Sequence, residues 1–167
     1  METRLVGVPE FRTGEIEGVV IRKLTRFIDS RGWLSELFRD DELPAWFSPV
    51  MAYVSMTEPG ITRGPHEHID QADFFCFLGP SHFKLRLWDN REGSSTYRVV
   101  TTVILGEDNP GSVLVPKGVV HAYQNTGSIS GMVINCPDRL YMGQHKAELV
   151  DEIRHEDDPN TIFQMND

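Results

Sequence analysis

The chain has little cysteine, a shortage of basic residues and no long apolar run. Its two cysteines, Cys76 and Cys136, stand in apolar strand-like segments without a CxxC spacing, which excludes a disulfide scaffold and predicts two reduced, packed thiols. Lys and Arg number 16 against 25 Asp and Glu, giving a net charge of −9. Because nucleic-acid phosphates favour a basic protein surface, this charge argues against a nucleic-acid partner. Small anionic ligands are still allowed, since they need only a local arginine cluster.

The lack of long apolar runs also argues against a membrane partner. No segment approaches the ~20 apolar residues that a membrane span needs, and the first four residues lack the charged-then-apolar pattern of a signal peptide. We therefore expect a cytoplasmic protein. At 167 residues, the chain is expected to form one domain that buries roughly 70% of the surface its unfolded form exposes.

Short strands separated by turn residues dominate the chain from residue 51 onward, a spacing that predicts a β-sandwich or barrel. The expected strands are 51–57, 63–68, 73–78, 83–88, 97–105, 112–115, 122–125 and 132–135. Before them, residues 19–28 and 33–38 flank the turn residues 29–32 and predict a hairpin. A short helix is expected over 40–47, and one or two helical turns over 138–150.

Two histidine-containing stretches form the candidate site. Side chains two apart in an extended strand share a face, so His66 and His68 are expected to point one way and Glu67 the other. Two imidazoles on one sheet face suit a metal or a proton-transfer site. Some fifty residues later, the stretch 116–125 supplies His121 just after a Pro/Gly corner. The histidines expected to lie on the surface are His82, His145 and His155.

These stretches resemble the two short motifs of the cupin superfamily. The residues that resemble the first motif, with Asp in place of Glu, are Gly60, His66, His68, Asp73 and Gly79. Those that fit the second motif, Pro-x-Gly-x-x-His-x-x-x-Asn, are Pro116, Gly118, His121 and Asn125. The resemblance implies an all-β protein, a jelly-roll cupin β-barrel with a few short helices.

Over about residues 27–163, the chain resembles the dTDP-4-dehydrorhamnose 3,5-epimerase family, which acts on nucleotide-linked 4-keto-6-deoxy sugars. The similar segments occur in the family's order at 27–36, 55–57, 63–66, 89–97, 116–123 and 158–162. The resemblance implies that His66 is the proton-abstracting base and that Asp158 orients it. It places further residues around the substrate, namely Arg31, Glu36, Arg63 and His121. It also implies a nucleotide-sugar ligand, no cofactor, and a homodimer that exchanges amino-terminal strands.

The same resemblance shows two departures from the family. The family's lysine for the developing enolate falls on Ala72 or Asp73, and its acid tyrosine falls near Ile134. Tyr141 is a candidate replacement for the acid, although a packed tyrosine explains it equally well. His68 is a gained imidazole, which favours a divalent metal.

Three hypotheses follow. The first is an epimerase-like enzyme that removes a proton next to the ketone of a nucleotide-linked deoxysugar. The second is a cupin of other activity that holds Zn, Mn, Fe or Ni through His66, His68, Asp73 and His121. The third is a sugar-nucleotide-binding relative without catalysis. In each, three parts are expected: residues 1–26 as an arm or edge strands available for dimer exchange, 27–145 as the barrel, and 146–167 as a tail packing back near the site.

Overall fold

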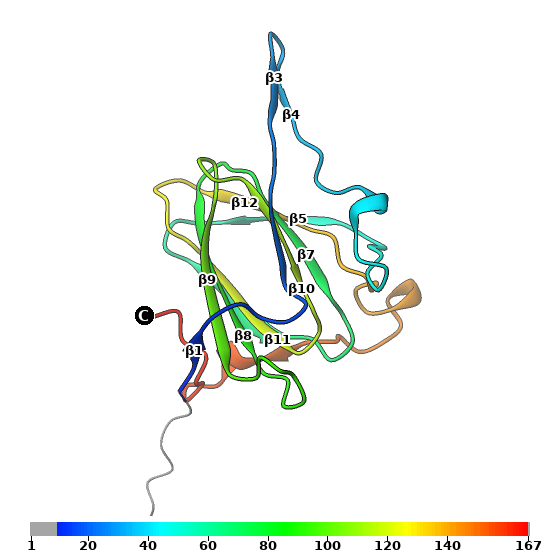
Figure 1. The fold of residues 1–167 in the computed structure, drawn as a ribbon, viewed down its shortest axis with the longest axis vertical. Helices are drawn as coiled ribbons and strands as arrows, with labels where there is room; N and C mark the ends of the chain where they lie inside the picture. The colour runs from blue at the N-terminus through cyan, green and yellow to red at the C-terminus, as the bar shows by residue number, and fades with distance from the viewer. Residues whose placement is uncertain (1–9, 167) are drawn as a thin grey trace, which may run out of the picture.

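The computed structural model describes residues 10–166, whose regular secondary structure is almost entirely β (Figure 1). The all-β prediction is confirmed. The strands are β1 (Arg12–Thr13), β2 (Val20–Lys23), β3 (Phe27–Asp29), β4 (Gly32–Leu34), β5 (Tyr53–Thr57), β6 (Thr62–Glu67), β7 (Asp73–Phe77), β8 (His82–Asp89), β9 (Val99–Gly106), β10 (Gly111–Val115), β11 (Val119–Asn125), β12 (Gly131–Asn135) and β13 (Ile153–Arg154). The described helices are three 3-10 turns, η1 (Asp40–Glu42), η2 (Gln144–Lys146) and η3 (His155–Asp157).

Two sheets enclose the core. One has the strand order β1-β9-β8-β11-β6-β13 and the other β2-β10-β7-β12-β5. Strand β8 alternates as its sequence predicts, with Phe83, Leu85 and Leu87 fully buried between the sheets. Phe75 and Phe77 of β7 meet them from the other sheet. The strands that carry the candidate site are therefore supported by a packed apolar core and not by loops.

The close approach of β6 to β11 positions two of the predicted histidines. The strands are antiparallel, and His66 stands opposite His121 in the register. Gly64 has a positive φ of 83°, and a Cβ at this position would lie 2.5 Å from the carbonyl oxygen of His121. Only glycine combines this φ with such close contact to a neighbouring backbone. Gly64→Ala would therefore separate the two strands next to the histidines.

The amino-terminal part packs on its own chain. Strand β1 pairs with β9 in parallel, and β2 pairs with β10 in antiparallel fashion. Ile16 lies in the core between the sheets, so this part of the expected arm also contributes a core residue. Ile16 is flanked by glycine and glutamate, so no apolar periodicity in the sequence indicates that it is a core residue. Residues 1–9 lie outside the described part, and exchange between subunits stays a prediction.

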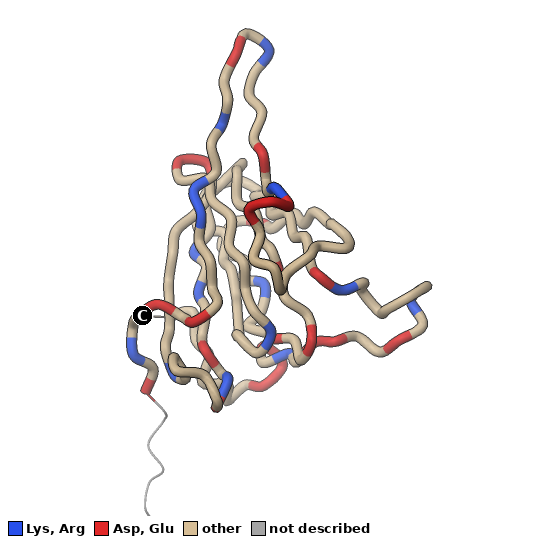
Figure 2. Tube along the Cα trace, turned by 45° about the vertical axis from the view of Figure 1, so that its right-hand side comes forward, with Lys and Arg blue, Asp and Glu red and all other residues tan. Residues whose placement is uncertain are grey.

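The predicted hairpin is present as β3 and β4, and it projects from the end of the barrel (Figure 1). Acidic and basic residues lie side by side at its tip (Figure 2), where Asp29 pairs with Arg31. The strand expected over 19–28 is instead divided into β2 and β3, because the first half pairs with β10 and the second only with β4.

The helix expected over 40–47 is wrong beyond its first turn. It ends at Glu42, and Leu43 is extended with ψ 148°. Leu43 precedes Pro44, and the proline ring disfavours the helical conformation in the residue before it. Within residues 10–166, no helix has the length and apolar character to cross a membrane.

Candidate active site

Three histidines converge inside the barrel, and a nitrogen of each lies within 4.8 Å of one from each of the others. His66 and His68 share a face as predicted, with ring centroids 5.7 Å apart. His121 of β11 lies against both, at 4.5 Å from the His66 ring and 5.6 Å from the His68 ring. Glu67 points to the opposite face of β6, where it meets Asn90 and His155.

The carboxylate of Asp73 is fully buried beside two of these rings. Its Oδ2 lies 3.0 Å from His68 Nε2 and 3.3 Å from His121 Nε2. The other nitrogen of His68, Nδ1, faces the carbonyl oxygen of Asp151. Both nitrogens of His68 therefore face acceptors, which an imidazole satisfies only when both are protonated.

The pKa values follow this arrangement. Burial alone would lower the pKa of His68, but the hydrogen bond and charge of Asp73 raise it to about 9. Burial raises the pKa of Asp73, while hydrogen bonds from His121 and His68 outweigh it and hold the pKa well below its usual range. At neutral pH the pair is a buried carboxylate beside an imidazolium, so His68 carries a positive charge that Asp73 balances.

His66 has a different environment. Its Nδ1 lies 3.6 Å from Glu152 Oε1 and 3.6 Å from Glu156 Oε1. Burial, followed by the neighbouring His121 and His68, lowers the pKa of His66 to about 2. The ring is thus neutral at physiological pH. Its Nδ1 is buried without a hydrogen-bond partner, and so is Glu156 Oε2.

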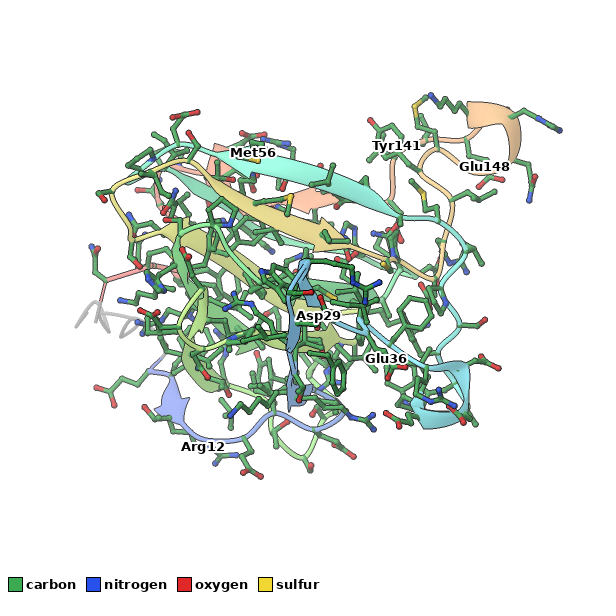
Figure 3. All side chains as sticks on the ribbon, turned by 90° about the horizontal axis from the view of Figure 1, so that it is seen from above. Arg12, Asp29, Glu36, Met56, Tyr141 and Glu148 are labelled. Carbon is green, nitrogen blue, oxygen red and sulfur yellow. The ribbon has the colours of Figure 1, made fainter. Side chains whose placement is uncertain are left out.

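Two residues that were candidates for catalytic roles, Asp158 and Tyr141, lie away from His66. Asp158 is exposed, and its carboxylate accepts the backbone N–H of Asn160 at 2.9 Å. The turn of η3 directs Glu156, not Asp158, toward the barrel. Tyr141 is 54% exposed on the loop after β12 (Figure 3). No contact among residues 10–166 joins Asp158 or Tyr141 to the three histidines.

The predicted substrate-binding residues are spread over the molecule. Arg63 lies at the start of β6, where Nε donates to Thr57 Oγ1 at 2.9 Å and Nη2 to the Met56 carbonyl at 2.7 Å. Arg31 lies at the hairpin tip, where it pairs with Asp29. Glu36 lies beside η1 (Figure 3). Within one chain, only His121 of this group lies among the site histidines, and the nucleotide roles of the others stay predictions.

Sequence reasoning missed a hydroxyl connected to the site. Tyr53 Oη accepts a hydrogen bond from Asn135 Nδ2 at 2.9 Å, and the same amide group donates to Asp73 Oδ1 at 2.8 Å. Burial and the charge of Asp73 raise the pKa of Tyr53 to about 12, against the lowering effect of Asn135. The strand 51–57 that carries Tyr53 was expected, but its sequence alone does not place the hydroxyl near Asp73.

The tail residues were missed for a different reason. The tail 146–167 was expected to pack back near the site, with Asp158 as the residue beside His66; instead β13 pairs with β6 and brings Glu152 and Glu156 to His66. His155, expected on the surface, donates to the buried Glu67 at 2.8 Å. Only the long-range pairing of the tail with β6 reveals these roles.

Comparisons with known proteins agree with this geometry. The sequence model of the dTDP-4-dehydrorhamnose 3,5-epimerase family matches residues 13–160. The spore coat polysaccharide biosynthesis protein SpsL of Bacillus subtilis is 40% identical over 113 residues, which are 67% of this chain and 73% of that protein. The probable low-salt glycan biosynthesis epimerase Agl13 of Haloferax volcanii is 35% identical over 128 residues, 75% of this chain and 81% of that protein.

A solved structure shows the same architecture. The dTDP-6-deoxy-D-glucose-3,5-epimerase RmlC of Legionella pneumophila, in complex with dTDP-4-keto-L-rhamnose, superposes with a TM-score of 0.71 at 21% identity over 85% of this chain and 74% of that one. This likeness confirms the predicted jelly-roll cupin barrel. With the family model covering most of the sequence, the chain belongs to the dTDP-4-dehydrorhamnose 3,5-epimerase family.

Proposed function

We propose that this protein acts on a nucleotide-linked 4-keto deoxysugar and moves a proton at a carbon next to the ketone. The observation that carries the proposal is a neutral, buried imidazole, His66, with two carboxylates at 3.6 Å from its Nδ1. Family membership supports the substrate class. An unprotonated imidazole offers a nitrogen that can take the proton, and the two carboxylates at its Nδ1 favour the protonated form.

In the proposed reaction, His66 takes the proton α to the ketone. The resulting imidazolium is stabilised by Glu152 and Glu156, as carboxylates stabilise protonated histidine in other general-base sites. The enolate that forms needs positive charge nearby. Our candidate is the imidazolium of His68, which is paired with Asp73 and stands in place of the family lysine that falls on Ala72 or Asp73 in this chain.

Returning a proton to the opposite face of the sugar ring requires a proton donor other than His66. Tyr53, linked through Asn135 to the buried Asp73, is our candidate in place of Tyr141. Its pKa of about 12 keeps the hydroxyl protonated at neutral pH. A phenol is therefore available as a proton donor throughout the physiological range.

Exchange with heavy water tests the function. The protein, incubated with a dTDP-4-keto-6-deoxy sugar in D2O, should introduce deuterium at a carbon flanking the ketone, detected by NMR. If the sugar binds but no label enters either carbon after long incubation, with or without added metal, proton abstraction from this substrate is excluded. The binding-only hypothesis then becomes the better account.

A metal-dependent reaction is the second candidate, favoured by the orientation of the imidazoles. Metal-ligating histidines usually donate their second ring N–H to a carbonyl or carboxylate. Here Nδ1 of His121 faces the Val119 carbonyl at 3.1 Å, Nδ1 of His68 faces the Asp151 carbonyl, and Nδ1 of His66 faces two carboxylates. The residues thus fit a divalent ion held by the three imidazoles, with Asp73 as a further ligand. Such an ion would polarise a carbonyl oxygen.

Elemental analysis separates the two candidates. If the metal hypothesis holds, protein purified without a histidine tag should carry close to one transition-metal ion per chain. His68→Ala should lose the ion, since removing one ligand of a small site removes much of its affinity. His82→Ala, which alters a surface histidine 3.4 Å from Asp108, is the matched control and should retain it. Protein that is metal-free and takes up no added zinc, manganese or nickel would contradict the hypothesis.

We also propose a homodimer in which the projecting hairpin of one protomer is covered by the other. Both strands of the hairpin expose large apolar side chains, including Ile28 at 81% and Leu34 at 64%. Apolar patches of this kind mark protein interfaces. Placing charge on this surface should therefore remove its contribution to dimer formation.

The double variant Ile28→Asp, Leu34→Asp should be monomeric in analytical ultracentrifugation, because two buried unpaired carboxylates oppose association. The control is Ile129→Asp, which places the same charge on an exposed isoleucine of the body. A dimer that persists in the double variant at micromolar concentration would place the interface elsewhere, and a monomeric wild type would exclude the dimer itself.

A further inference from the structure

The carboxyl-terminal tail, residues 146–167, contacts β6 on both faces of the strand. On the face opposite His66, the carboxylate of Glu67 is buried, and its Oε1 accepts hydrogen bonds from His155 Nε2 and Asn90 Nδ2, both at 2.8 Å. A buried carboxylate is stable only when it is paired in this way. Glu67 is therefore a fixed anchor, and His155 is attached to it.

His155 is also held through its ring face. The ring centroid lies 4.5 Å from that of Phe163, which is buried and packs against Trp88. The imidazole is thus restrained at its edge by a hydrogen bond and on its face by an aromatic contact. Little rotational freedom remains for the backbone that carries it.

The next residue in the chain is Glu156, which faces the opposite way. Pairing of β13 with β6 sets Ile153 opposite Glu67 and Arg154 opposite His66, so the tail follows the edge of β6 at this point. From η3, the side chain of His155 contacts Glu67 on one face of β6, and the side chain of Glu156 lies next to His66 Nδ1 on the other face. Adjacent residues thus connect the anchor on one face with the imidazole on the other.

Glu156 needs such a restraint. Its Oε2 is buried without a hydrogen-bond partner, a costly arrangement that the side chain would relieve by turning outward. The cation nearest to it, Arg154, lies 3.2 Å from Oε1 but is half-exposed, and surface ion pairs contribute little. The buried contact of His155 with Glu67 is the stronger candidate for keeping Glu156 in place.

We propose that Glu67 and His155 are positioning residues that hold the Glu156 carboxylate against His66. The inference rests on the proposed role of His66 as the base. Neither residue is assigned a contact with substrate. Their effect passes through Glu156, which stabilises the imidazolium formed when His66 accepts a proton.

Turnover in the deuterium-exchange reaction tests the inference. His155→Ala should lower kcat by roughly tenfold to a hundredfold with KM within about twofold, because misplacement of about 1 Å in a catalytic array has effects of this size. In a Glu156→Gln background, His155→Ala should cause no further loss. His155→Gln, whose amide N–H can still reach Glu67, should restore most of the rate, and His82→Ala should match wild type.

A second measurement does not depend on turnover. In a 1H–15N NMR spectrum of the histidine rings, His155→Ala should shift the His66 signals, whereas His82→Ala should leave them in place. If wild type shows no exchange, the proposed function fails, and this spectrum alone decides the positioning role. Unshifted His66 signals would overturn the inference. So would unchanged kcat in His155→Ala, or losses that multiply independently with Glu156→Gln.

Discussion

His66→Asn is expected to reduce the rate of deuterium exchange by roughly 10²- to 10⁴-fold, the range associated with loss of a general base. Asparagine has a similar shape to one side of the imidazole and preserves hydrogen bonding, but it cannot accept the proton. The neutral state of His66 and the two carboxylates at its Nδ1 both point to this ring as the acceptor. The initial rate of label entry, followed by NMR, measures the effect.

Matched variants identify which carboxylate assists. His82→Asn makes the same change at a surface histidine and should leave exchange at the wild-type rate. Glu156→Gln should slow exchange, because the His66 imidazolium loses a neighbouring anion. Asp158→Asn tests the role implied by family resemblance. If Asp158→Asn slows exchange and Glu156→Gln does not, the tail must rearrange on substrate binding. Exchange at the wild-type rate in His66→Asn would remove His66 as the base.

Local patterns were sufficient to find the histidines. The two-residue spacing of His66 and His68 put both on one face because the strand period is two, whatever the rest of the fold does. Their meeting with His121 depends on β6 pairing with β11, which the cupin-like spacing of the two motifs anticipated. Where a functional group depends on strand periodicity and a recognisable corner, the sequence is informative.

The groups around the histidines were less predictable. Glu152 and Glu156 lie in a charged, irregular segment, and no local period indicates which of its carboxylates turns inward. Their placement depends on the pairing of β13 with β6 and on the contact of His155 with Glu67, both over more than eighty residues. Asp158 was preferred because an Asp-Pro pair resembled the family, but the turn of η3 shifts the inward position to Glu156.

Asp73→Asn is expected to destabilise the protein by roughly 3–5 kcal/mol at pH 6, the cost typical of removing one partner of a buried ion pair. Asp73 is buried between His68 and His121, so its loss leaves the His68 imidazolium without a counter-charge. Urea unfolding measures the change. Asp108→Asn, which alters an acid 3.4 Å from the surface His82 but largely exposed, should cost less than about 1 kcal/mol.

The destabilisation caused by Asp73→Asn should become smaller as the pH rises. The folded-state pKa of His68 is raised to about 9, above the ~6.5 of an unfolded chain, so its stabilising contribution is full below about pH 6.5 and is lost as the pH rises through 9. The pKa of Asp73 is lowered, so its contribution is present above about pH 4 and is lost in acid.

Wild type should therefore lose stability between pH 6.5 and 9, while Asp73→Asn should show a flatter profile, because the carboxylate that retains the proton on His68 is gone. The difference between the two proteins should narrow toward pH 9. A loss below 1 kcal/mol at pH 6, or a difference that stays constant up to pH 9, would contradict an ionised Asp73 and a cationic His68, and with them the proposed stabilisation of the enolate by His68.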